Sequence, residues 1–345
     1  MKNDLMKLGC HLAAFAWLAV AGCGTSASTP DGGAPDSATS NDAAGGSEAM
    51  KRCMIIGDSV RAAGFDDKVK VTCDQKYAWL EGDTYPAHEK MTDITGTNDQ
   101  VPLPAPGYRS PIVLAPSKAT KYTTIDAALG VAVNGVPVYD YTSQGMLDPA
   151  VYDPRADTKV TGELDLCNGH AGRGDDYHYH AAPVCMIAAM KNKGPAAIIG
   201  WGFDGYPIYG NTNPDGTPIK QGELDVCNGK SDAIFGYRYH TSEMHPYITQ
   251  CLVGTVDLAI APRVAPPDRQ GGGGKPPGSK PPGGVQNLKL VEDPNGTRTM
   301  TYQWQGQTYS IQYKPSATAN CWDFEEKSYT TGGVLQKNTY CRVVK

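Results

Sequence analysis

The chain has 345 residues, with 31 basic and 36 acidic side chains and a formal net charge of −5. This length allows two or three domains, and the acidic balance gives no support for a nucleic-acid partner, which calls for clustered positive charge. The 40 glycines, 26 prolines and 19 tyrosines predict a mainly β protein of short strands and turns. Only residues 127–132 and 187–193 are predicted to form short helices.

The first 22 residues have the features of a bacterial lipoprotein signal peptide. Lys2 and Lys7 precede an apolar stretch at residues 8–21. Small residues follow at the end of this stretch, directly before Cys23. Cleavage there would make Cys23 the lipid-bearing first residue of an exported chain, on the periplasmic or cell-surface face of a membrane. The alternative is an ordinary signal peptide in which Cys23 is incidental. Residues 23–50, rich in Ser, Gly, Ala and Asp, predict a flexible tether.

A duplicated pattern fills the middle of the chain, within a predicted domain at residues 51–261. The octapeptide Gly-Glu-Leu-Asp-Leu-Cys-Asn-Gly that begins at Gly162 recurs at Gly222 with a single change, and an Asn-Gly turn at Asn134 recurs as Asp-Gly at Asp204. These dipeptides between short apolar runs are strong hairpin signals, because both central residues of such turns take positive φ. The sequence therefore predicts two related hairpin units, at about 126–195 and 196–256, in one pseudo-symmetric, disulfide-stapled domain.

The tetrapeptide Tyr177-His178-Tyr179-His180 is the most informative motif of the chain. Alternate side chains of a strand point to opposite faces, so the two histidines share one face and the two tyrosines share the other. His170 lies close upstream, and neutral imidazole is the commonest metal ligand. The cluster predicts a site for zinc or copper, and imidazole ligands do not choose between them. The alternative is a surface face of a hairpin whose tyrosines form the core.

The second unit keeps the tyrosines but changes the polar face. Its tetrapeptide reads Tyr237-Arg238-Tyr239-His240, and Lys230 stands where the first unit has His170. Lysine and arginine only donate hydrogen bonds, so they predict a site for a carboxylate or phosphate rather than for a cation. Solvated surface charge is the alternative. His240 remains a candidate metal ligand.

The cysteines also favour export, because disulfides persist in oxidising compartments. Cys10 lies in the signal peptide, Cys23 is the lipidation candidate, and the other eight form local pairs along the chain. Sequence alone does not fix the pairing, although two of the pairs bracket the two tetrapeptides in the same way. Cysteines as metal ligands are the alternative. The predicted disulfides are Cys53–Cys73, Cys167–Cys185, Cys227–Cys251 and Cys321–Cys341.

The C-terminal third divides into two parts. Residues 262–284, with four consecutive glycines and two Pro-Pro-Gly repeats, predict a linker. Residues 285–345 predict a small β module, because runs of alternating polar and apolar residues at 299–304 and 308–313 flank a turn. This module carries no catalytic signature.

The order of these motifs resembles the YHYH domain family of secreted bacterial proteins. The resemblance rests on Leu-Asp-x-Cys-Asn-Gly-His, Tyr-His-Tyr-His, Asp-Gly-x-Pro-Ile-Tyr-Gly and a second Leu-Asp-x-Cys-Asn-Gly, and covers about Cys73 to Gly254. It implies that His88, in Pro86-Ala87-His88, belongs to the site as a further metal ligand, but it implies no general activity. Arg238 departs from the family, in which a second Tyr-His-Tyr-His is common.

Three function classes follow from these residues. The first is an exported, membrane-anchored protein that binds zinc or copper through its histidines. The second is a metal-dependent enzyme at the same site, for which the sequence leaves the catalytic groups and the small-molecule or surface ligand unassigned. The third is a cell-surface binding or adhesion module without a metal. A separate calcium signal comes from the alternating oxygen-bearing side chains of Asn211, Asn213 and Asp215, which also make ordinary turns.

Overall fold

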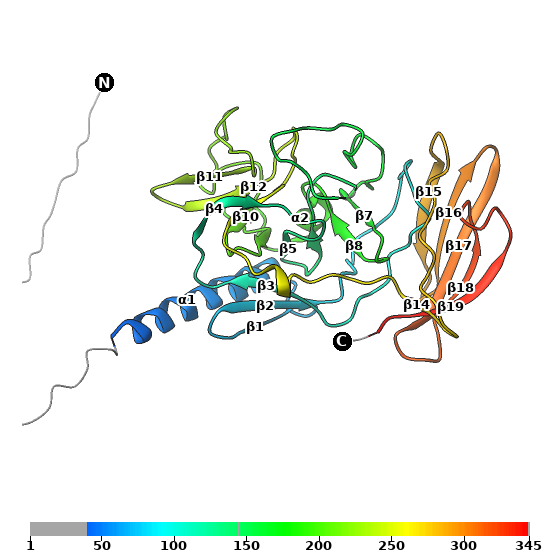
Figure 1. Ribbon diagram of the computed structural model, residues 1–345, viewed down its shortest axis with the longest axis horizontal. Coiled ribbons are helices and arrows are strands. Elements are labelled where there is room, and N and C mark those ends of the chain that lie inside the picture. The colour runs from blue at the N-terminus through cyan, green and yellow to red at the C-terminus, as the bar shows by residue number, and fades with distance from the viewer. Residues whose placement is uncertain (1–39, 144, 344–345) are drawn as a thin grey trace, which may run out of the picture. The chain divides into compact units, whose positions relative to one another are not determined.

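The structure, a computed structural model, describes residues 40–143 and 145–343, with side chains from residue 48 onward (Figure 1). The chain is mainly β, as the sequence predicts. The predicted signal peptide, the lipidation candidate Cys23 and most of the predicted tether lie outside the described residues. Among the described helices, none combines the length and the apolar character that crossing a bilayer demands.

Helix α1 (Ser40–Ala63) is an element that sequence analysis missed. Its N-terminal part, up to Met50, falls within the predicted tether. Ile56, Val60 and Ala63 recur at helical spacing and are buried in the main core. The exposed Ile55 lies directly beside them in the sequence, so the apolar positions do not form a clean stripe that a periodicity argument can detect.

A small antiparallel sheet follows α1 in the order β1-β2-β3. The disulfide between Cys53 and Cys73 joins α1 to its first strand. The inward-facing Ala78 and Leu80 pack with the buried residues of α1 in the main core. The three strands are β1 (Lys70–Cys73), β2 (Tyr77–Gly82) and β3 (Tyr108–Val113).

An eight-stranded sheet carries the duplicated units, in the order β11-β12-β10-β9-β5-β6-β8-β7. Each unit contributes the same arrangement of strands from the centre of the sheet outward. An antiparallel hairpin comes first, a strand parallel to it comes next, and an antiparallel strand forms the outer edge. The units meet at β5 and β9, where Val131 pairs with Trp201. The pseudo-symmetric domain is therefore one continuous sheet. Its strands are β5 (Gly130–Ala132), β6 (Pro137–Val138), β7 (Gly169–Ala171), β8 (Tyr177–Tyr179), β9 (Gly200–Gly202), β10 (Pro207–Tyr209), β11 (Gly229–Asp232) and β12 (Gly236–His240).

The helix predicted at residues 127–132 is wrong, because its second half is strand β5. Gly135 has φ of +81° in the turn that closes the β5–β6 hairpin. The Asn-Gly turn therefore makes this segment a strand of a hairpin instead of a helix. The other predicted helix, at 187–193, overlaps α2 (Val184–Ala189) only at residues 187–189. The chain leaves that helix at Met190, which is extended.

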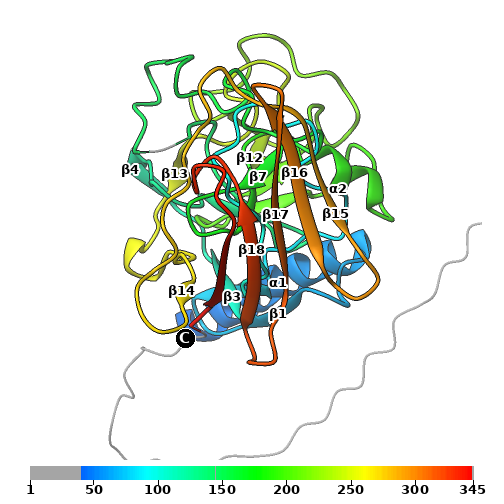
Figure 2. The ribbon, with the colours of Figure 1, turned by 90° about the vertical axis from the view of Figure 1, so that its right-hand side faces the viewer.

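The C-terminal residues form an antiparallel sheet in the order β14-β19-β18-β17-β16-β15, part of which Figure 2 shows face-on. Its core includes Met300, Ile311 and Phe324, and it also takes in Val101 and Leu103 from the earlier part of the chain. Segment 262–284, predicted as a linker, contains the short strand β14. The strands are β14 (Asp268–Arg269), β15 (Gln286–Glu292), β16 (Arg298–Trp304), β17 (Gln307–Pro315), β18 (Cys321–Lys327) and β19 (Gln336–Cys341).

Four disulfides join the eight remaining cysteines in the local pairs that the sequence suggests. Two of them, Cys167–Cys185 and Cys227–Cys251, staple the two units at equivalent places. These two disulfides link residues 18 and 24 positions apart and so restrict the unfolded chain around each hairpin. The remaining elements are a two-stranded pair, β4 (Lys118–Thr123) with β13 (Leu252–Gly254), and a short 3₁₀ helix, η1 (Leu258–Ile260).

Candidate metal centre

The hairpin β7–β8 brings His170, His178 and His180 together. His170 pairs directly with His178 across the two strands, so both side chains lie on the same face of the sheet. His180 follows at the next position of that face. A tight turn precedes β7, in which Asn168 takes φ of +66°. All three histidines are buried, with 2–7% of each residue exposed.

The three imidazole rings form a nearly equilateral triangle. Their centroids are 4.8 to 4.9 Å apart in all three pairs, and one ring nitrogen of each lies within 4.8 Å of the others. The Nε2 atoms of His170 and His180 are 3.0 Å apart. Nitrogen ligands at about 2.0–2.1 Å from a tetrahedral metal ion lie about 3.3 Å from each other. This cluster can therefore hold one metal ion after small shifts.

The neighbours of His180 fix its tautomer. Its Nδ1 contacts the backbone carbonyl oxygen of Asp140, which can only accept a hydrogen bond, so Nδ1 carries the proton. The Nε2 atom then presents a lone pair toward His170, as metal-binding histidines commonly do. Burial lowers the pKa of both His170 and His180 well below the usual value, and the neighbouring histidines lower it further. Both rings are therefore neutral near pH 7.

Asp176 is a further member of the site that sequence analysis missed. Its Oδ2 lies 3.5 Å from Nδ1 of His178, and both side chains are buried. Neither atom has a hydrogen-bond partner among the described residues. An unpaired buried carboxylate is costly, and a cation beside it would offset that cost. Strand alternation could have found Asp176, because it lies two residues before His178.

The histidines open onto a cavity of about 370 Å³. Gly172 leaves room for His178, because a Cβ atom at this glycine would lie 2.2 Å from Cε1 of the ring. The carboxyl group of Asp140 belongs to the cavity wall, and burial raises its pKa to about 7. Polar groups thus surround the cluster on its open side, where a fourth metal ligand or a small molecule has space.

The tyrosines lie on the opposite face and belong to the core. Tyr177 and Tyr179 are fully buried. The Tyr177 hydroxyl donates to Asp165 at 2.8 Å, and burial raises the pKa of this carboxyl group to about 6. Because these tyrosines are inside, they do not form an exposed recognition surface.

His88 lies with the tyrosines, away from the histidine triangle. Its Nε2 is 2.6 Å from the Tyr179 hydroxyl and its Nδ1 is 2.6 Å from the carbonyl oxygen of Glu89. The ring also lies close to Cys167 and Cys185, whose sulfur atoms are joined in a disulfide. The structure therefore does not bring His88 together with His170, His178 and His180.

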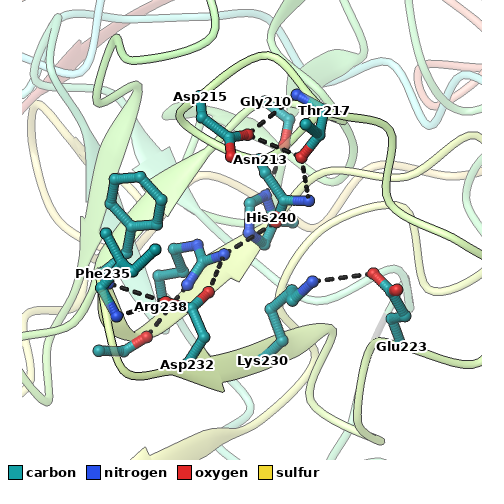
Figure 3. Close-up of polar contacts among 12 residues, drawn as sticks. Gly210, Asn213, Asp215, Thr217, Glu223, Lys230, Asp232, Phe235, Arg238 and His240 are labelled. Atoms are coloured by element: carbon teal, nitrogen blue, oxygen red, sulfur yellow. Dashed lines mark hydrogen bonds and ion pairs between the residues drawn. The ribbon is translucent and has the colours of Figure 1, made fainter.

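The corresponding face of the second unit is filled by ion pairs (Figure 3). Arg238 is fully buried and bonds to Asp232 and to Oδ1 of Asn213, each at 2.8 Å. Lys230 bonds to Glu223 at 2.8 Å. Both cations predicted to bind an external anion thus contact acidic side chains of their own unit. His240 is buried beside Arg238, and Nδ1 lies 2.8 Å from the Gly210 carbonyl oxygen.

The segment with the calcium-like pattern is a turn closed by its own side chains. Oδ1 of Asp215 accepts hydrogen bonds from the amide and hydroxyl groups of Thr217. The side-chain oxygen of Asn213 accepts from Arg238, as Figure 3 shows. The guanidinium therefore already occupies one of the oxygen atoms that the calcium interpretation requires.

A comparison with protein-family models identifies the domain that holds this site. Residues 110–221 match the family described as YHYH protein, which confirms over that segment the resemblance inferred from the motifs. The matched segment contains all three clustered histidines and Asp176. No curated protein and no solved structure matched the chain.

Proposed function

We propose that this protein is an exported metal-binding protein that holds one zinc or copper ion between His170, His178 and His180. The observation that carries the proposal is the buried triangle of imidazoles beside Oδ2 of Asp176, a buried atom that accepts no hydrogen bond from the described residues. The neutral, buried rings of His170 and His180, of which His180 has a fixed tautomer, are suited to metal binding, because no proton must be displaced from a charged ring.

The ligand set favours zinc or copper(II) over hard cations. Imidazole nitrogen suits both of these ions, whereas calcium and magnesium prefer oxygen ligands. The nearby carboxylate of Asp176 would balance part of a divalent charge. Thiolate ligands are unsuitable here, because the eight cysteines of the described residues are all joined in disulfides.

Export is supported by the four disulfides, since such bonds persist in oxidising compartments. We further propose that a lipid at Cys23 holds the chain on a membrane, as the sequence before it suggests. Stable attachment takes more than one acyl chain, because a single chain binds only marginally. Replacement of Cys23 by serine should release the protein from the membrane fraction.

The cavity beside the histidines favours a second candidate, a metal-dependent enzyme. Catalytic metal sites use three protein ligands and leave one position open. The three histidines and the space of about 370 Å³ fit that arrangement. Asp140 and Asp176 supply carboxyl groups at the same wall, although the geometry does not select a substrate.

Elemental analysis of the purified, untagged soluble protein after mild dialysis tests the main proposal. We expect about one zinc or copper ion per chain, and its loss when His178 and His180 are both replaced by alanine, because a three-histidine site that loses two ligands does not keep tight binding. The matched control is His240→Ala, which changes the equivalent residue of the second unit and should leave the metal content unchanged. A double variant that folds and retains full metal would refute the proposal.

A further inference from the structure

Segment 262–284, which we call the strap, forms part of the wall around the histidine cavity. Arg263, Val264, Pro277, Gly278 and Lys280 line the same cavity as the three histidines. They reach it from a part of the chain that follows both duplicated units. The strap is therefore a cover for the cluster as well as a connection to the C-terminal sheet.

Two ion pairs fasten the strap to the rim of the cavity. Lys275 bonds to both carboxylate oxygens of Asp175, at 2.8 and 2.9 Å, and both side chains are buried. Lys280 bonds at 2.5 Å to Glu163, whose side chain is also buried, while the lysine itself remains half exposed. Loss of either lysine would leave a buried carboxylate without its countercharge.

The strap is also fitted closely to the backbone beneath it. A Cβ atom at Gly278 would lie 1.6 Å from the carbonyl oxygen of Asn98, so only glycine allows this approach. At its other end, Arg342 donates to the carbonyl oxygens of Ala265 and Asp175 at 3.0 and 2.9 Å. These contacts place the strap at a defined position against the first unit.

Ion pairs and hydrogen bonds, including the pairing of β14 with β19, hold this part of the chain, and apolar packing contributes little. Most of its residues are exposed, and none of them belongs to a hydrophobic core cluster of the described chain. Three consecutive glycines, Gly271 to Gly273, take positive φ values. A segment without core contacts opens locally at a lower cost than a packed strand, and breaking its ion pairs lowers that cost further.

The two units differ in the source of the cation at this rim. In the second unit, Glu223 pairs with Lys230 of the same unit. In the first unit the corresponding carboxylate, Glu163, faces a strand that carries His170 instead of a lysine, and Lys280 of the strap supplies the charge. The exchange of lysine for histidine thus makes the first unit dependent on the strap.

We propose that the strap is a latch that controls how fast the metal ion enters and leaves the histidine cluster. This inference rests on the proposed metal binding. The histidines are only 2–7% exposed and the strap forms part of the wall of their cavity, so an ion passes more readily once Lys275 and Lys280 leave their carboxylates. The latch sets the rate of exchange and leaves the three ligands, and hence the affinity, largely unchanged.

The test compares the parent chain with Lys275→Ala/Lys280→Ala. Each protein is loaded with zinc, or with copper(II) if elemental analysis finds copper, and mixed with a coloured chelator in a stopped-flow instrument. We expect the release and uptake rates of the variant to rise by about tenfold or more while the dissociation constant stays within about threefold, because a weaker latch raises the open population. The matched control is Lys337→Ala, which removes a 2.6 Å ion pair with Glu325 in the C-terminal sheet and should exchange metal at the parent rate.

A second variant guards against misfolding caused by unpaired carboxylates. Lys275→Met with Asp175→Asn removes both charges of one pair and keeps the side-chain sizes, and it should also accelerate exchange. Unchanged exchange rates in both folded variants, with metal bound, would overturn the latch alone. A parent chain that binds neither ion would overturn the proposed function and the latch with it.

Discussion

The two duplicated units have the same backbone frame, but the polar faces of their hairpins carry different residues. In the first unit the Tyr177 hydroxyl donates to Asp165, and in the second the Tyr237 hydroxyl donates to Asp225. Asn168 and Asn228 occupy the same left-handed turn position, with φ of +66° and +64°. The scaffold of tyrosines, aspartates and asparagines is therefore independent of what the other face does.

The polar faces differ in where their positive charge comes from. The second unit has a guanidinium of its own, and Arg238 fills the position that His178 has in the first unit. Asp232 and Asn213 surround that guanidinium. The first unit instead presents ring nitrogens and an unpaired carboxylate, Asp176. One hairpin frame can therefore either carry a cationic side chain of its own or provide ligands for a cation that binds from solution.

The largest expected effect tests the shared scaffold. Tyr177→Ala and Tyr237→Ala should each lower the free energy of unfolding by on the order of 2–5 kcal/mol, because each removes a buried ring and takes one hydrogen-bond donor from an aspartate. Chemical denaturation with a chelator present measures both without a contribution from metal.

Similar losses at the two positions would support a common frame. The conservative pair Tyr177→Phe and Tyr237→Phe serves as the control, since it retains the rings and removes only the hydroxyl groups. If the alanine variants unfold like the parent but lose a ligand, the tyrosines act in recognition and the frame lies elsewhere.

Much of this frame follows from local sequence. The Asn-Gly and Asp-Gly dipeptides fix the hairpin turns, the alternation of Tyr177 to His180 fixes the faces, and the repeated cysteines match the disulfides. Each of these inferences uses residues that are neighbours along the chain. The histidine triangle could be predicted for the same reason, because two of its members lie in one short extended segment and the third lies across a short hairpin.

Contacts between distant segments could not be predicted in this way. The role of Lys280 depends on a carboxylate at Glu163, more than a hundred positions earlier, and a Pro- and Gly-rich composition alone suggests a free linker. His88 was assigned to the site from the order of the family motifs, which contains no information on distance. In the folded chain it lies beside Tyr179, on the face opposite the histidine triangle. Arg238 and Lys230 look available for an anion in the sequence, whereas their acidic partners become visible only when the second hairpin is closed.

A smaller effect concerns acid stability of the metal-free protein. Burial lowers the pKa of His240 to about 4 and that of its counterpart His180 well below the usual value. A histidine whose folded pKa is depressed destabilises the fold as the pH falls below about 6.5, because the unfolded chain then binds the proton more tightly. At pH 5 this amounts to at most about 2 kcal/mol for each residue.

Replacing each histidine by glutamine should remove its part of the acid destabilisation. For His240 the effect should level off near pH 4, whereas for His180 it should continue to grow at pH values below 4. Denaturation curves from pH 7 to about pH 3 measure the difference from the parent, which isolates the histidines from Asp140 and Asp165. Those carboxyl groups act in the opposite direction, since their raised pKa values stabilise the fold as the pH falls. Identical profiles for parent and variants would contradict the assignment.

The smallest expected effect converts the second unit toward the first. Nδ1 of His240 already contacts the carbonyl oxygen of Gly210, as His180 contacts that of Asp140, and its buried Nε2 has no partner among the described residues. Lys230→His with Arg238→His would place three imidazoles around that point. Asp232, freed from the guanidinium, would supply the carboxylate that Asp176 supplies in the first unit.

The double variant should bind a second metal ion more weakly than the first. At ten times the dissociation constant of that site, the added stabilisation is about 1.4 kcal/mol, which calorimetric titration and melting curves can detect. The single variant Arg238→His is the control and should bind less tightly, because it provides two imidazoles instead of three. A stoichiometry that stays at one would mean that the shared frame is insufficient. The room that Gly172 leaves for the His178 ring would then be the feature that the second unit lacks, because Asp232 stands at the corresponding place.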